Sequence, residues 1–265
     1  MIIPIGSLDD PSVSAYRTLK DKDLDRAGEL FIAEGPYIVR RLFESDFPVV
    51  SVISSENRLP QIQGIVPEDV PLYVAKQEVF RGILGMKFQS GVMACGRRKP
   101  RRTMVQVIPK KDHLTLVILP DIANAQNVGS LVRISAAFGA DAIILGEQCH
   151  DPFWRQAIRV SMGTVFRLPL YQSSNLLEDL ERLKKQWGVE LVASVLHEDA
   201  QPLEKASRSS RLGILFGNEA QGLGEQYIRA CDLRVTIPMK LGTDSLNVAV
   251  AAGIFLYEFT KIKNG

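Results

Sequence analysis

Long apolar runs are missing from this sequence, and their absence excludes one class of protein at the outset. The longest stretch without Asp, Glu, Lys or Arg runs for thirteen residues, from Ser245 to Tyr257, whereas a helix that spans a bilayer needs about 20. The opening residues, MIIPIGSLDDPS, contain no basic segment and become acidic by Asp9. We therefore expect neither a secretory signal nor an Arg-rich transit peptide, and the sequence predicts a cytoplasmic protein without a membrane span.

Residues that ligate metals are also scarce. The chain has 3 cysteines, Cys95, Cys149 and Cys231, and 3 histidines. The cysteines are widely spaced and form no CxxC pair, so we expect neither a disulfide framework nor a zinc knuckle. Cys149 and His150 are adjacent, but neighbouring side chains usually point apart and no second cluster completes a ligand set. The sequence therefore predicts no metal site.

Familiar nucleotide-binding motifs are missing too. No GxGxxG follows the first apolar run of the second half of the chain, so a standard dinucleotide site is not expected. Gly217 and Gly222 have the spacing of a phosphate loop, but Leu223 and Gly224 stand where that motif has Lys and then Ser or Thr. A ligand at this loop would have no phosphate-binding lysine. The glycines can equally be plain turn residues.

Length and composition indicate a globular protein. The chain has 265 residues, of which 46% are hydrophobic and 23% charged, which suits one large or two medium domains. Residues 1–100 alternate short β-like runs with helical patterns and predict a small α/β domain. The segment RRKPRR follows at its end, and we predict a basic linker over 101–111. Such a run serves solubility or attachment to phosphates, and the segment alone favours neither.

The second half, 112–265, repeats the β-α alternation more strongly. Its β-like runs are LTLVILP (114–120), AIILG (142–146), TVFRLPL (164–170), VELVASV (189–195), LGILFG (212–217) and LRVTIPM (233–239), and its helical patterns cover 128–138, 173–187 and 245–261. Nearly uniform apolar runs are typical of strands buried on both faces of a largely parallel sheet. We therefore predict a doubly wound α/β domain, whose ligands bind beyond the carboxyl ends of its strands.

Three loops follow strands in this domain and direct attention to that edge. They are DIANAQNVGSLVR (121–133), in which Asn127 is predicted to cap a helix, FGNEAQGLG (216–224), and IPMKLGTDSLN (237–247). The helix after the third loop has no polar face for nearly three turns, so we expect it to be buried all round. It is either a plain core helix or part of a subunit interface.

These loops carry a resemblance to a known family. NVGSLVR, LFGNEAQGL and IPMKLGTDSLNVAVAAG, in this order, resemble the motifs of the SpoU family of RNA ribose 2'-O-methyltransferases, members of the SPOUT superfamily. The resemblance spans residues 114–260, and FIAEGPYIVRRLF resembles the N-terminal substrate-binding module of that family. It implies an α/β fold with a C-terminal SPOUT domain that contains a deep trefoil knot, a small ribosomal-protein-like α/β domain before it, S-adenosylmethionine as cofactor, and a homodimer.

The same resemblance implies roles for particular residues. Cofactor contacts fall on Gly217, Ile237, Met239, Leu246 and Asn247, and the catalytic set comprises Arg133, Asn127, Glu219, Ser245 and Asn247, with Arg133 at its centre. A guanidinium has a pKa above about 12 and is a poor base. Our hypothesis is therefore that Arg133 binds a substrate phosphate and positions the ribose hydroxyl; its alternative is a salt bridge on the helix surface.

The leading functional hypothesis is an S-adenosylmethionine-dependent RNA 2'-O-ribose methyltransferase that acts on 23S rRNA, because the extra N-terminal module accompanies ribosomal targets in the family. A tRNA substrate and resistance-type methylation of rRNA are alternatives within this class. Two other classes are a non-catalytic RNA-binding or ribosome-assembly protein and a flavodoxin-like nucleotide enzyme. RNA contacts are expected on the N-terminal domain and on Arg97, Arg98, Lys99, Arg101 and Arg102.

Overall fold

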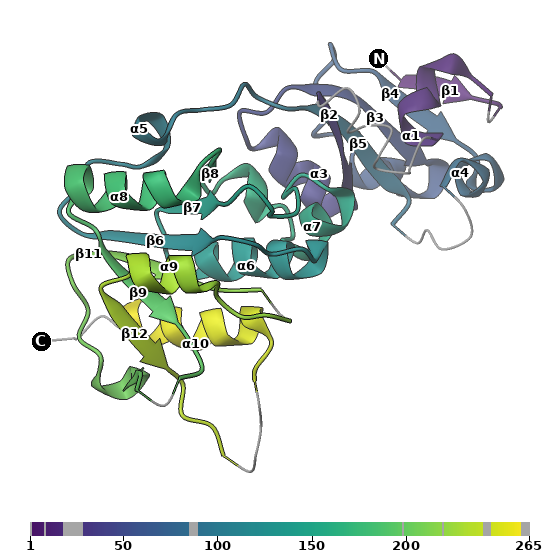
Figure 1. Cartoon of the computed structure of the whole chain (residues 1–265). Helices are drawn as coiled ribbons and strands as arrows, with labels where there is room; N and C mark the ends of the chain where they lie inside the picture. The colour runs from purple at the N-terminus through teal and green to yellow at the C-terminus, as the bar shows by residue number, and fades with distance from the viewer. Residues whose placement is uncertain are drawn as a thin grey trace, which may run out of the picture. The chain divides into compact units, whose positions relative to one another are not determined.

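The computed structural model in Figure 1 describes residues 2–7, 9–17, 29–84, 90–197, 199–218, 220–240 and 245–260. The chain forms two compact units. The first unit comprises Met1–Pro100 and Phe153–Arg167, and the second comprises Arg101–Pro152 and Leu168–Gly265. The sequence prediction assigned all of 112–265 to one domain, whereas the segment 153–167 packs with the first unit.

The first unit is built on a five-stranded mixed sheet in the order β1-β4-β3-β5-β2. Its strands are β1 (Ile2–Ile5), β2 (Leu30–Glu34), β3 (Val49–Ser55), β4 (Leu72–Ala75) and β5 (Val92–Arg97), and its helices are α1 (Ser14–Arg17), α3 (Pro36–Phe43), α4 (Gln77–Leu84) and α7 (Arg155–Val160). Strands β1, β3 and β4 run parallel, and β5 pairs antiparallel with both β2 and β3.

Side chains alternate across this sheet, so successive residues of β2 enter different cores. Ile32 joins a cluster with Tyr16 and Phe80. Phe31 instead contacts three rings, Phe47, Phe153 and Phe166, at centroid distances of 5.4 to 5.8 Å. Two of those rings belong to the segment 153–167, and ring contacts of this kind explain why that segment packs with the first unit.

The second unit has a seven-stranded sheet in the order β10-β12-β9-β11-β6-β7-β8, in which every recorded strand pair is parallel. The strands are β6 (Leu114–Leu119), β7 (Ala142–Leu145), β8 (Leu170–Gln172), β9 (Glu190–Ser194), β10 (Gln201–Pro202), β11 (Arg211–Leu215) and β12 (Leu233–Thr236). The helices are α5 (Met104–Val107), α6 (Ala125–Ala137), α8 (Leu176–Trp187), α9 (Glu225–Ala230) and α10 (Val248–Thr260). The parallel core that the sequence predicts is therefore present.

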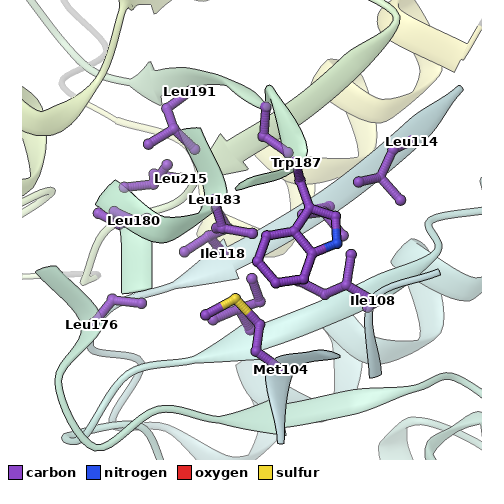
Figure 2. Packing of buried hydrophobic residues seen from close by; sticks show 14 of the residues in the cluster. Met104, Ile108, Leu114, Ile118, Leu176, Leu180, Leu183, Trp187, Leu191 and Leu215 are labelled. Carbon is purple, nitrogen blue, oxygen red and sulfur yellow. The ribbon is translucent and has the colours of Figure 1, made fainter. Parts of the chain in front are cut away.

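The central strands are buried on both faces, as their apolar composition predicts. Leu114 and Ile118 of β6 belong to one buried cluster with Leu180 and Leu183 of α8 (Figure 2), and every residue of β6 is buried. Strand β6 lies between β7 and β11. After β6 the chain continues to β7, toward one end of the strand order, and after β11 it continues to β12, toward the other end. The loops that follow these two strands lie side by side at the carboxyl edge, where parallel sheets bind ligands.

Three sequence predictions differ from the structure. The predicted strand 164–170 is a 3₁₀ turn over Thr164–Phe166, and β8 begins only at Leu170, because the side chain of Phe166 is buried in the first unit rather than in the parallel sheet. The predicted linker 101–111 contains α5, whose Met104 and Val107 enter the core of the second unit. Helix α6 is capped by Asn124, which accepts from the N–H groups of Gln126 and Asn127.

The last helix, α10, is not buried all round within one chain. Val250, Ile254 and Tyr257 retain 51%, 39% and 57% of their accessible surface, whereas Ala252, Phe255 and Leu256 are buried. The exposed residues lie at spacings of four and three, so they occupy one side of the helix. None of the helices in the described part of the chain is both long enough and apolar enough to cross a membrane.

An ion pair in the first unit provides a test of how the segment 153–167 is held. Arg155 Nε donates to Glu34 Oε2 at 3.1 Å, and the two side chains are only 18% and 9% exposed. Because Arg155→Met leaves a largely buried carboxylate without this partner, we expect the free energy of unfolding of the first unit to fall by about 1–3 kcal/mol. Urea unfolding can be followed by the fluorescence of Trp154 in a Trp187→Phe background, since the chain has only 2 tryptophans.

The matched control is Arg167→Met, which removes an arginine from the exposed pair with Glu44 in the same unit. That change should cost less than about 1 kcal/mol, because exposed pairs are screened by water. Equal losses from the two variants would contradict the structural importance of the buried pair.

Candidate active site at the carboxyl edge of the parallel sheet

A cavity of about 560 Å³ opens at the carboxyl edge of the second unit, a volume typical of sites for small ligands and cofactors. Its walls come from β9 and β12, from the segments that follow β9, β11 and β12, and from α9 and α10. Four of the five predicted cofactor residues line it: Gly217, Ile237, Met239 and Leu246. Two of the three predicted loops therefore meet around one cavity.

The loop after β11 is closed by its own backbone. Asn218 N–H donates to Gly222 O at 2.9 Å, and Gly222 N–H donates to Asn218 O at 2.8 Å. A Cβ at Gly217 would collide with the backbone of Gly222 and Leu223, and Gly222 has a φ of +69°. Both glycines are therefore required by the loop, one for the close backbone approach and one for the left-handed conformation.

The inner wall of the cavity is apolar. Phe216 and Phe255 meet edge to face with centroids 5.6 Å apart, and Leu223 and Val248 lie beside them with at most 8% of their surfaces exposed. A planar aromatic ring fits such a wall, while backbone groups of the loops can satisfy its polar edge. The inner wall of the cavity therefore suits a ligand that contains a planar ring, such as a nucleoside.

The third predicted loop is joined to the first by a side-chain hydrogen bond. Asn247 Nδ2 donates to Asn127 Oδ1 at 3.1 Å across 120 residues of sequence, and Asn247 Oδ1 accepts from Ala249 N–H at 2.9 Å. The second bond is that of a helix cap at the start of α10. Because both atoms of the Asn247 amide are used, its orientation is set, and its bond to Asn127 Oδ1 in turn orients the Asn127 side chain.

Helices α6 and α10 lie side by side and run in the same direction. Asn127 and Asn247 mark their N-terminal ends, and about three turns later the rings of Phe138 and Tyr257 meet with centroids 6.3 Å apart. Two helix N-termini thus converge beside the cavity. Their partial positive charges favour negative charge on a ligand or on a reacting oxygen.

The other predicted catalytic residues take no part in the hydrogen bond between Asn127 and Asn247. Ser245 lines the cavity. Arg133 is exposed on α6, six residues after Asn127, which turns it about 120° around the helix from Asn127. Arg133 forms no recorded ion pair with the described residues, so the salt-bridge alternative has no partner among them. Glu219 lies outside the described residues.

The cavity also contains titratable residues to which the sequence analysis assigns no role in the site. His197, Glu225 and Arg234 line it; Glu225 is engaged by Arg229 at 3.0 Å, and His197 lies 3.6 Å from Asp199. His197 follows β9, Arg234 lies in β12 and Glu225 begins α9, and only their position near strand ends could have indicated them.

Cys149 has a structural place beside the same edge. Its Sγ donates to Leu119 O at 2.8 Å and accepts from Ile122 N–H at 3.3 Å, which holds the loop after β7 against the loop after β6. Burial raises the pKa of the Cys149 thiol to about 12, so the thiol stays neutral and unreactive near pH 7. Among the described residues, no three or more His, Cys, Asp or Glu side chains gather as metal ligands do.

The predicted RNA-binding residues are placed in two groups. In the first unit, Arg97 pairs with Glu29 at 2.9 Å, Arg98 lies 5.4 Å from the centre of the Phe153 ring, and Lys99 lies 4.4 Å from the centre of the Phe47 ring. In the second unit, Arg101 and Arg102 are exposed, and Arg102 donates to the carbonyl of Gln106. Arg101 is the most freely presented of these cations.

Comparison with known proteins agrees with this arrangement. The model of the SpoU rRNA Methylase family matches residues 114–257, more than half of the chain. An uncharacterised tRNA/rRNA methyltransferase of Mycobacterium bovis is 34% identical over 261 residues, which cover 96% of this chain and 90% of the relative. The 23S rRNA (guanosine-2'-O-)-methyltransferase RlmB of Acinetobacter baylyi is 29% identical over 214 residues, with 79% and 86% covered.

Among solved structures, the AdoMet-bound rRNA methyltransferase from Sinorhizobium meliloti superposes with a TM-score of 0.83 at 26% identity, covering 97% of both chains. The similarity therefore extends over both units and not only over the matched motifs. Together with the family match and the meeting of the predicted loops, it confirms the resemblance drawn from the sequence. The chain belongs to the SpoU rRNA methylase family.

Proposed function

We propose that the protein is an S-adenosylmethionine-dependent RNA methyltransferase that methylates a ribose 2'-oxygen, with 23S rRNA as its substrate. The observation that carries the proposal is the hydrogen bond between Asn127 and Asn247 beside the cavity lined by Gly217, Ile237 and Leu246. Two similar proteins support it: the Acinetobacter baylyi relative is named a 23S rRNA (guanosine-2'-O-)-methyltransferase, and the similar structure from Sinorhizobium meliloti is an AdoMet-bound rRNA methyltransferase. A tRNA substrate is the alternative, as the mycobacterial relative's name includes both RNAs.

The residues of the cavity fit this cofactor. Its apolar wall suits the adenine ring, and the loop at Gly217 offers backbone groups without a phosphate-binding lysine. When bound, S-adenosylmethionine supplies an electrophilic methyl group on a sulfonium. Gly217, Ile237, Met239 and Leu246 would hold it. Asn247 belongs with Asn127 at the edge of the site, because it does not line the cavity itself.

The remaining residues act on the RNA. Transfer to a 2'-hydroxyl requires that the oxygen be aligned with the methyl group and lose its proton. Asn127, which accepts a hydrogen bond from Asn247, orients the ribose through its side-chain amide. The paired N-termini of α6 and α10 favour the negative charge that develops on the oxygen. Arg133 and Ser245 complete the set: Arg133 binds a neighbouring phosphate with its guanidinium, and Ser245 contacts the ribose or the cofactor. Glu219 is assigned to the same site.

The proposal includes a finer architecture. The C-terminal segment after β12 is threaded as a trefoil knot, the first unit corresponds to a ribosomal-protein-like RNA-binding domain, and the protein is a homodimer that acts in the cytoplasm. The exposed apolar side of α10, formed by Val250, Ile254 and Tyr257, supports the homodimer, because apolar stripes of this kind are commonly covered by a second subunit. RNA binds to the first unit and to the exposed arginines Arg101 and Arg102.

The direct test is methyl transfer from labelled S-adenosylmethionine to RNA. We expect the protein to label deproteinised 23S rRNA, and mapping of alkali-resistant positions should place the label on a ribose 2'-oxygen. Label on a base, or on no RNA of any kind, would contradict the proposed reaction. Label on tRNA alone would support the alternative substrate.

Two variants connect that activity with the site. Asn247→Asp keeps the cap acceptor for α10 but loses the donor to Asn127, so turnover should fall about a hundredfold through misplacement of Asn127 while the fold persists.

Arg133→Lys keeps the charge but cannot bind a phosphate with two parallel hydrogen bonds, and its turnover should also fall. Normal turnover of Arg133→Lys would exclude bidentate positioning.

The loop after β11 gives a prediction about cofactor binding. Gly217→Ala forces the backbone of Gly222 and Leu223 to move, so we expect S-adenosylmethionine to bind at least tenfold more weakly and the second unit to lose about 1–3 kcal/mol of stability. Isothermal titration calorimetry and urea unfolding measure the two effects. Gly64→Ala is the control, because nothing lies within 4 Å of a Cβ at Gly64. Unchanged cofactor affinity in Gly217→Ala would place the cofactor elsewhere.

RNA binding can be separated from cofactor binding at Arg101. The Arg101→Glu variant should weaken RNA binding, with the slope of log affinity against log salt reduced by about one for each lost phosphate contact. Cofactor affinity should not change, since Arg101 does not line the cavity. Lys205→Glu, which makes the same charge change at another exposed position, is the control. A parallel loss of cofactor binding would contradict this division of roles.

A further inference from the structure

A second cavity lies at the opposite edge of the same sheet. It has a volume of about 350 Å³, and its lining includes Leu114 and Arg211, the first residues of β6 and β11, together with Trp187, the last residue of α8. Strand β6 has 6 residues, so this amino edge is about 20 Å from the carboxyl edge that holds the proposed active site. We call it the amino-edge pocket.

The wall of this pocket contains an unsatisfied donor. Trp187 is 7% exposed, and its indole Nε1–H is buried without a hydrogen-bond partner among the described residues. Figure 2 shows the ring nitrogen on the side of the indole that faces Leu114 and Ile108. Leaving a buried N–H unpaired costs free energy, so an acceptor that enters the pocket beside the ring would gain a hydrogen bond that the chain itself does not supply.

The charged groups around the pocket are mainly donors as well. Lys110, Lys111 and Arg211 line it. Lys111 pairs with Asp141, and Arg211 donates to Trp187 O at 2.8 Å and lies 3.8 Å from Asp112. Lys110 is exposed and forms no recorded ion pair with the described residues. The site therefore presents one uncommitted cation beside two partly neutralised ones.

Apolar surface completes the pocket. Val105 of α5 lines it and is 63% exposed, although it is a large hydrophobic residue on a short helix. A ligand that has anionic oxygen acceptors and a less polar part next to them would match the lysines, the indole N–H and this apolar rim together. A nucleotide unit of RNA has that combination: phosphate oxygens beside a ribose and a base.

We propose that the amino-edge pocket binds a phosphate of the RNA substrate, with the adjoining nucleotide against Val105 and Trp187. The inference rests on the proposed RNA substrate. It adds an anchor remote from the methylated ribose, which binds RNA without contacting the cofactor. A large folded RNA can contact both edges of the sheet at once, whereas a short one cannot.

The test uses the full chain with Trp154→Phe, which leaves Trp187 as the only tryptophan. Titration with a single-stranded RNA oligonucleotide should change the emission of Trp187 saturably. Lys110→Glu should weaken this binding several-fold and reduce the salt slope by about one. Lys205→Glu serves again as the control and should leave the emission titration unchanged. In the chain with both tryptophans, Trp187→Phe, which keeps a ring but removes the N–H, should weaken RNA binding measured by filter retention about fivefold.

Three results would overturn the inference. The first is that RNA does not change the emission of Trp187, and the second is that Lys110→Glu and Lys205→Glu weaken RNA binding equally. The third is that inorganic pyrophosphate saturates the pocket and RNA cannot displace it, which would assign the pocket to a free phosphate compound. S-adenosylmethionine binding, measured in the same variants, should stay at the level of the parent chain. If RNA binds at the pocket as expected but no methyl group is transferred, the result would contradict the proposed function and leave the inference about the pocket standing.

Discussion

The hydrogen bond between Asn247 and Asn127 is the interaction on which the rest of the site depends. It links the start of α10 to the start of α6, which are 120 residues apart in sequence. The same Asn247 side chain caps α10 through Ala249. One amide therefore fixes where the last helix begins, how it lies along α6, and which way Asn127 presents its own amide. A change at this point would affect fold and chemistry together.

The sheet supplies the frame for this contact. Strand β6 is buried completely between β7 and β11, and the loops that follow β6 and β11 leave the sheet at the edge where the chain direction diverges. The amide-lined loop at Gly217 is closed by two backbone hydrogen bonds, so its shape does not depend on a ligand. The cavity is therefore largely pre-formed, and binding energy need not be spent on ordering it.

The sequence predicted the regular elements well where burial alone decides them. The runs at 114–120 and 212–217 are apolar because both faces of β6 and β11 are covered, and a pattern of that kind can be read without a structure. The run at 164–170 misled because its Phe166 is buried against Phe31, more than 100 residues earlier in the chain. The cap of α6 was assigned to Asn127 instead of Asn124, since two asparagines three residues apart satisfy the same local rule.

The site itself was less accessible to such reasoning. Gly217 and Leu246 were located only through the family resemblance, because periodicity does not show that two distant loops share a cavity. Arg234 and His197 were missed, as nothing in their local sequence marks them as neighbours of Gly217. The unpaired indole of Trp187 was also invisible, since the sequence gives only a tryptophan at the end of an amphipathic helix.

The path of the chain between the two units has a consequence for how such proteins can be built from parts. The backbone leaves the second unit after Pro152, contributes Phe153 to Arg167 to the first unit, and then returns. No single cut in the sequence separates one unit cleanly from the other. A gene fragment that encoded 112–265 alone would carry Phe153 and Phe166 without the rings that cover them. Exchange of the first unit between relatives would therefore have to exchange the segment 153–167 as well.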